Sequence, residues 1–248
     1  MYKFFVTKEQ IFDNVIEIVE DVNHIKNVLR LNIGEKIEIC NISNSTNYIC
    51  KIIKVDKNLV KAEILNEVEV KNEPKVYLHI FQGLPKQEKM ETIIQKTTEI
   101  GACEITPVVM NRCIVKLDDK SSMKKVERWQ KVSEVAAKQS KRDRIPIVNQ
   151  PISIKSIYEK IKNYDIVLVA YENEEEIGIK TILKQLNKKD STKIAVIIGP
   201  EGGIEENEIG YLKDIGAKVI TLGRRILRTE TAPIVLSSII MYELDEMI

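Results

Sequence analysis

The pattern of hydrophobic positions divides the chain into two parts. In the first seventy or so residues, short runs rich in Val and Ile alternate with Asn, Gly, Ser and Asp-Lys-Asn breaks, which is typical of β strands joined by turns. The runs cover residues 29–31, 36–41, 48–55 and 59–65. Because these runs are short and closely spaced, this part of the chain predicts a small β-barrel or sandwich.

Residues 66–74 are charged, lack a long apolar face and end in a proline, so a domain boundary is expected there. Beyond them, apolar runs alternate with segments whose apolar residues recur at helical spacing, which predicts an α/β fold with a parallel sheet. The runs at 165–170 and 193–198 are apolar enough to be buried on both faces of such a sheet. We therefore expect two domains, residues 1–72 and 73–248.

The same spacing locates the elements of the second part. Gly101 is expected to stop its first helix, and Thr231 is expected to be the N-cap of a last helix that runs to the C-terminus. Strands are expected at 76–81, 104–110, 165–170, 193–198 and 218–222. Helices are expected over about 87–100, 122–140, 179–186 and 205–215.

Composition narrows the class of protein. The chain of 248 residues is 44% hydrophobic and 30% charged, and it contains no apolar run long enough to cross a bilayer. Its first ten residues lack the features of a signal peptide, so a cytoplasmic protein is expected. The four cysteines form no C-x-x-C pair, and His24 and His79 are the only histidines. A zinc site or a Ser-His-Asp triad is therefore not expected, and no metal is predicted.

Charge is unevenly distributed although the net charge is only +1. Residues 112–144 hold eleven Lys or Arg against five Asp or Glu. Such a stretch can face an anion such as RNA, but a charge run taken alone is more often a solvated helix face.

A glycine-rich turn between a strand and a helix, at residues 197–209, is the first candidate site. In open α/β sheets ligands bind beyond the carboxyl ends of the strands, where glycines allow the backbone to approach closely. The turn matches neither G-x-x-x-x-G-K-[ST] nor G-x-G-x-x-G, and four glutamates follow or flank it, so a neutral or cationic ligand fits better than a polyphosphate. The alternative is a tight turn with a well-charged helix start.

A second strand end, at residues 222–236, carries a glycine and three arginines within a short turn. Dense arginines usually pair with phosphate or carboxylate, and Glu230 can hold Arg228 by a bidentate bond. The alternative is a surface ion-pair network. Because both glycine turns follow strands near the C-terminus, they can share one pocket.

Together, I-G-P-E-G-G and the later L-G-x-R-I-L-R-x-E-T-A resemble the double signature of the RsmE-type ribosomal RNA methyltransferases of the SPOUT class. Residues 95–109 and 136–146 resemble two further family segments, and His24, Leu29, Arg30 and Gly34 resemble its N-terminal pattern. The resemblance covers essentially the whole chain. The chain departs from the family at Lys138, where Glu is common, and at residues 136–137, where Ala-Ala replaces Glu-Ala.

The resemblance implies a PUA-like β-barrel domain followed by a SPOUT domain whose C-terminal part forms a deep trefoil knot. It implies a homodimer that uses S-adenosylmethionine to methylate N3 of a uridine in 16S ribosomal RNA. By position, the cofactor is expected to be bound by Gly199, Pro200, Glu201, Gly202, Leu222, Gly223 and Leu227. The alternatives are a SPOUT enzyme acting on another RNA, such as the ribose 2′-hydroxyl of transfer RNA, and a non-catalytic RNA-binding protein.

Roles for individual residues follow from the chemistry of this reaction. The sulfonium methyl is already activated, so catalysis consists mainly of alignment and the handling of one proton, without a metal. Arg228 is expected to stabilise the negative charge on the uracil oxygens, with Glu230 orienting it. Glu201 and Glu230 are candidate bases, and neither is assigned that role. RNA binding is expected from Arg30, Lys138, Lys141, Arg142 and Arg144.

Overall fold

The chain forms two compact units in a computed structural model that describes residues 1–116, 118–186 and 192–247. The first unit comprises Met1–Glu73 and Ala137–Ile145, and the second comprises Pro74–Ala136 and Pro146–Ile248. The predicted division placed residues 137–145 in the second domain, whereas in the structure they pack with the first. Ala137 belongs to a small buried cluster with Phe5 and Cys40, which accounts for this return of the chain.

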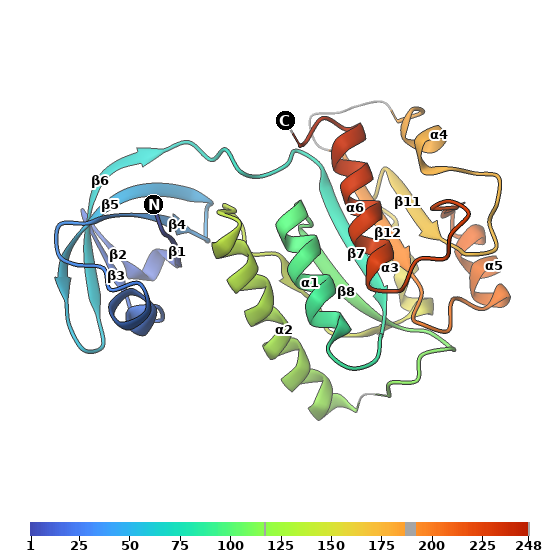
Figure 1. The fold of residues 1–248 in the computed structure, drawn as a ribbon, viewed down its shortest axis with the longest axis horizontal. Coiled ribbons are helices and arrows are strands. Elements are labelled where there is room, and N and C mark those ends of the chain that lie inside the picture. Colours follow the sequence, from blue (N-terminus) through green and yellow to red (C-terminus); the bar gives the residue numbers. More distant parts are fainter. Residues whose placement is uncertain (117, 187–191, 248) are drawn as a thin grey trace. The chain divides into compact units, whose positions relative to one another are not determined.

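The first unit, all of whose residues are described, is built on a curled mixed sheet of six strands (Figure 1). The first pair, β1–β4, is parallel and every other pair is antiparallel. Alternate residues such as Ile37 and Ile39 face a buried core, as period-two patterning requires. The order across the sheet is β1 (Lys3–Val6), β4 (Lys36–Asn41), β5 (Thr46–Val55), β6 (Val60–Val68), β3 (Val15–Ile18) and β2 (Ile11–Phe12).

One predicted strand of this unit is wrong. Residues 29–31 form no strand; instead His24–Val28 is a short π-helix, η2, and Arg30 takes a positive φ of 54°. Leu31 is nevertheless buried in the core of the unit, so the apolar run there marks a buried loop. The other three predicted runs correspond to β4, β5 and β6, and a 3₁₀ turn, η1 (Lys8–Gln10), joins β1 to β2.

The second unit is built on a parallel sheet, as predicted. Within its described residues β7 and β12 are central, and Ile194 and Ile197 are fully buried, one in the core on each face. β9 (Ile147–Val148) pairs with β8 outside this path. The order is β10 (Ile152–Ser153), β8 (Glu104–Val109), β7 (Tyr77–Gly83), β12 (Lys193–Ile198), β11 (Ile166–Ala170) and β13 (Lys218–Ile220).

Helices cover both faces of this sheet (Figure 1). On one face α1 (Lys89–Ile100) and α6 (Thr231–Glu243) pack side by side, and on the other lie α3 (Ile157–Ile161) and α5 (Glu206–Asp214). α1 ends at Gly101, whose φ of 125° is the conformation expected of a stop glycine. The remaining helices are α2 (Asp119–Gln139), η3 (Ile154–Ser156) and α4 (Ile179–Leu183).

The last helix differs slightly from its prediction. Its N-cap is Glu230 rather than Thr231, and it ends at Glu243, before the C-terminus. None of the helices formed by the described residues is long and apolar enough to span a membrane.

Candidate active site

A cavity of about 910 Å³ lies at the carboxyl ends of β11, β12 and β13. Its wall is formed mainly by the three loops that follow these strands, together with Lys89, the first residue of α1, and Ala232 of α6. The two glycine turns singled out in the sequence therefore face one cavity. The seven predicted cofactor-binding residues all line it: Gly199, Pro200, Glu201, Gly202, Leu222, Gly223 and Leu227. The structure shows that these seven residues line one cavity, whereas their role in binding the cofactor stays a prediction.

Two glycines of the wall take conformations that other residues rarely adopt. Gly203 has a φ of 73°, and a Cβ built there would collide with the carboxylate of Glu172. Gly223 has a φ of 105° and open space where a Cβ would lie. At both positions the backbone itself forms the wall, which is the arrangement that lets main-chain groups reach a ligand.

A buried hydrogen-bond network holds the first glycine turn. The Thr229 hydroxyl donates to the Gly199 carbonyl at 2.7 Å, and the Gln82 side-chain amide donates to Thr229 Oγ1 at 2.9 Å. These contacts join the end of β7, the turn after β12 and the loop before α6. Sequence reasoning missed Gln82, although a glutamine at the end of an apolar strand was a signal that could have identified it.

Replacing Thr229 by valine should destabilise this junction. The variant keeps the shape of the side chain but leaves the Gly199 carbonyl with only the Gln82 amide, at 3.4 Å. A loss of about 1–3 kcal/mol in the free energy of unfolding is expected, as for a buried acceptor that loses its donor. Urea denaturation measures it, with Thr181→Val, an exposed change in α4, as the control. Equal stability of the two variants would contradict the role of the network.

Lys89 bridges two carboxylates beside the cavity. Its ammonium lies 3.0 Å from Glu201 Oε1 and 3.2 Å from Glu230 Oε2, and the Lys86 backbone N–H also donates to Glu201 at 3.0 Å. Burial raises the pKa of Glu201, but hydrogen bonds from backbone N–H groups and from Lys89 outweigh it, so that pKa is lowered overall. Glu201 is thus ionised at neutral pH and a weak proton acceptor. Sequence patterning carried no signal for Lys89.

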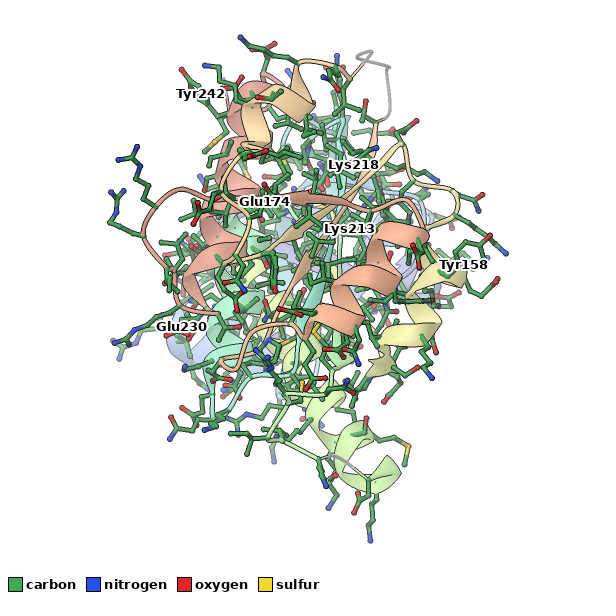
Figure 2. The ribbon with its side chains drawn as sticks, turned by 90° about the vertical axis from the view of Figure 1, so that its right-hand side faces the viewer. Tyr158, Glu174, Lys213, Lys218, Glu230 and Tyr242 are labelled. Carbon is green, nitrogen blue, oxygen red and sulfur yellow. The ribbon has the colours of Figure 1, made fainter. Side chains whose placement is uncertain are left out.

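Arg228 lines the cavity, and its side chain is 83% exposed. One guanidinium nitrogen lies 3.9 Å from Glu230 Oε1, so the expected bidentate bond is replaced by a single long ion pair. Glu230 has its closer cationic contact with Lys89. Figure 2 shows Glu230 at the start of α6.

Apart from Lys89 and Glu201, the charged residues of the cavity wall fall into two groups. Glu172, Glu174 and Glu175 come from the loop after β11, while three arginines at residues 224, 225 and 228 come from the loop after β13. Glu174, labelled in Figure 2, already accepts the backbone N–H of Glu176 at 3.0 Å. The wall suits a ligand that carries both signs of charge, and S-adenosylmethionine, with a sulfonium, an ammonium and a carboxylate, fits that description.

The five residues predicted to bind RNA lie in the first unit and differ in exposure. Arg30, Lys141 and Arg144 are exposed. Arg142 is 3% exposed, and its Nε lies 3.0 Å from Glu73 Oε1. Lys138 Nζ lies 2.8 Å from Asp21. Burial against Glu73 gives Arg142 a structural contact within the first unit, and its predicted RNA contact stays a prediction.

The described residues contain no group of three His, Cys, Asp or Glu side chains arranged to hold a metal ion. The four cysteines are all free thiols.

Two family profiles match the chain. One, described as an RNA methyltransferase domain, covers residues 71–241 and therefore the whole cavity wall. The other, described as an RNA methyltransferase PUA domain, covers residues 19–65 of the first unit.

Relatives named Ribosomal RNA small subunit methyltransferase E align over nearly the whole chain. That of Bacillus subtilis (strain 168) is 36% identical, over 99% of this chain and 98% of the relative. That of Mesomycoplasma hyopneumoniae (strain 232) is 35% identical, over 95% of this chain and 97% of the relative.

A solved structure of a Ribosomal RNA small subunit methyltransferase E from Neisseria gonorrhoeae, bound to S-adenosylmethionine, has the same fold. The TM-score is 0.86 at 28% identity, and the alignment covers 98% of this chain and 97% of that one.

Proposed function

Because this chain belongs to the ribosomal RNA small subunit methyltransferase E family, we propose that it transfers the methyl group of S-adenosylmethionine to N3 of a uridine in 16S ribosomal RNA. The observation that carries the proposal is the cavity lined by both glycine turns of the family signature. The alternative of a non-catalytic RNA-binding protein is disfavoured, because such a protein has no use for a cavity with walls of both charges.

The chain's own residues bind and align the reactants and stabilise the charge that develops on the uracil. Bound S-adenosylmethionine supplies a methyl group already activated by the sulfonium. Backbone groups of the turns at Gly199 and Gly223 approach the cofactor, and the carboxylates of Glu172 and Glu175 offer partners for its positive groups. Binding the two reactants in line provides much of the barrier reduction.

Arg228 is proposed to act on the uracil. As the N3 proton leaves, negative charge spreads onto the two oxygens that flank N3, and a guanidinium at the mouth of the cavity stabilises one of them. Its high exposure suits contact with an RNA base that has been flipped out of its stack. Glu230, 3.9 Å away, holds the guanidinium toward the cavity.

We further propose, on the family resemblance, that the C-terminal part of the second unit forms a trefoil knot. The same resemblance supports a homodimer and a cytoplasmic location. It also supports binding of 16S ribosomal RNA within the small subunit.

RNA binding is proposed to involve Arg30, Lys141 and Arg144, the exposed members of the predicted set. Replacing Lys141 and Arg144 together by alanine should weaken RNA binding and reduce its salt slope by about one for each phosphate that is no longer neutralised. Filter binding over a salt series measures this, with Lys57→Ala as a matched removal of charge in an exposed turn of the same unit. An unchanged slope would contradict the assignment.

Arg142→Ala should lower the stability of the first unit, since it removes the guanidinium that pairs with Glu73.

A methyl-transfer assay on small-subunit RNA and on assembled subunits tests the function. Digestion to nucleosides, followed by chromatography against standards and mass spectrometry, should identify N3-methyluridine at one site. A 2′-O-methylated nucleoside would favour the alternative SPOUT activity. Cofactor binding without any transfer to these substrates would overturn the proposed substrate.

A further inference from the structure

The cations that line the cavity differ in how they are held. Arg224, Arg225 and Arg228 are exposed, whereas the Lys89 side chain is only 29% exposed and is the least exposed cation of the described wall. Lys89 is the first residue of α1, and it enters the cavity between the glycine turn and the N-cap of α6. Desolvating a charge costs free energy, so a half-buried ammonium in a ligand cavity requires contacts that compensate this cost.

Two carboxylates fix the direction of this ammonium. Glu201 Oε1 lies 3.0 Å and Glu230 Oε2 lies 3.2 Å from the Lys89 Nζ, so the ammonium makes two ion pairs. Because an ammonium carries three N–H groups, it can also donate to a ligand in the cavity. The four side chains together carry no net charge, because the positive charges of Lys89 and Arg228 are matched by the carboxylates of Glu201 and Glu230. The group therefore does not repel an anion that forms beside it.

We propose that Lys89 is a catalytic residue that donates an N–H to one of the two uracil oxygens beside N3. This role rests on the proposed function. N3 loses its proton to water in the cavity, and the N3 electron pair forms the bond to the methyl carbon. The electrons of the broken S–C bond stay on sulfur, leaving a neutral thioether. Lys89 then stabilises one of the two uracil oxygens, and Arg228 stabilises the other.

The proposal predicts a pH-dependent defect. Lys89→Met should slow single-turnover methylation by about a hundredfold near neutral pH, as for removal of one donor to a developing oxyanion. The defect should shrink as pH rises, because alkaline solution removes the N3 proton without help from the lysine. Cofactor affinity, measured by calorimetry, should stay within about threefold of the parent. Lys89→Arg should retain part of the rate.

Lys86→Met is the matched control, since it removes a neighbouring exposed charge that lies outside the cavity wall. It should methylate at the parent rate. If Lys89→Met does not fold, as judged by thermal unfolding, the pH profile of Lys89→Arg decides, and a defect of constant size would overturn the role.

Three results would overturn the role of Lys89. A defect of equal size at every pH would mean that the residue only ties Glu201 to Glu230. A large loss of cofactor affinity would mean that it binds the carboxylate of S-adenosylmethionine, and a parent-like rate would mean that it has no part in the reaction. If the parent enzyme makes a product other than N3-methyluridine, the proposed function falls and this role falls with it. If the parent makes N3-methyluridine, only the role of Lys89 is in question.

Discussion

Gly83→Ala is expected to lower the affinity for S-adenosylmethionine by a hundredfold or more, although Gly83 is absent from the cavity wall. Gly83 ends β7, and a Cβ built there would lie 2.6 Å from the backbone nitrogen of Pro200 and 2.9 Å from the carbonyl carbon of Gly199. Both are main-chain atoms, so the added methyl can be accommodated only by moving the glycine turn. Overpacking of this kind typically costs about 1–3 kcal/mol, and the loss of the buried bonds to the Gly199 carbonyl adds to it.

Calorimetry with S-adenosylmethionine measures the effect on folded protein, and denaturation measures the accompanying loss of stability. Gly210→Ala is the matched control, because Gly210 lies within α5 with open space at its Cβ position. That substitution should be neutral or stabilising by up to about 1 kcal/mol. Parent-like cofactor affinity and stability in Gly83→Ala would show that the turn is not held against the end of β7.

Asp143→Ala is expected to destabilise the first unit by about 3–5 kcal/mol, the usual cost of removing one partner of a buried ion pair. Asp143 and Lys3 are fully buried and in contact, and Asp143 also accepts the Asn72 backbone N–H at 2.9 Å. The change would leave the Lys3 ammonium with Glu38 alone, at 3.0 Å. The segment that returns from α2 would also lose its anchor on β1.

Hydrogen exchange of the first unit's backbone amides in urea would measure this loss without averaging over both units. Arg144→Ala, an exposed change at the next residue, should have little effect. Lys3→Met combined with Asp143→Ala should recover part of the stability, because it removes both buried charges. Amide protection that is unchanged in Asp143→Ala would contradict the anchoring role.

The same pair predicts a pH dependence. Burial raises the pKa of Asp143, but hydrogen bonds from Lys3, Asn47 and Asn72 outweigh it and lower that pKa below its ordinary value. A carboxyl with a depressed pKa contributes stability above its unfolded pKa, and the contribution is lost as pH falls through the folded pKa. The difference between parent and Asp143→Ala should therefore be full at neutral pH and shrink below about pH 4.

The residues of the active-site cavity could be predicted because their signals are local. A buried parallel strand reads as a continuous apolar run, and ligands bind where such strands end. The runs at 193–198 and 218–222 are each followed by glycine, and both turns line the observed cavity. In each case the end of the run and the glycine are adjacent in the sequence, so the cavity residues could be predicted without knowing any contact between distant residues.

Contacts between distant residues could not be predicted from the chain. Arg142 and Arg144 stand two positions apart in one basic run, yet Arg142 is buried because Glu73 pairs with it, whereas Arg144 is exposed. Lys89 is one of 38 cations in the sequence, and only the fold brings Glu201 and Glu230 to it.

The sequence by itself thus determined the parallel α/β class, most elements of the second unit in their order, and the turns that line the cavity. These features follow from apolar periodicity and from glycine conformation, which act over a few residues. The tertiary structure alone decided that residues 137–145 return to the first unit, that Gln82 holds the glycine turn and which charges are buried. The physical reason is that burial and ion pairing depend on groups that folding brings together. Because these groups lie far apart in the sequence at irregular spacings, no sequence pattern predicts their contacts.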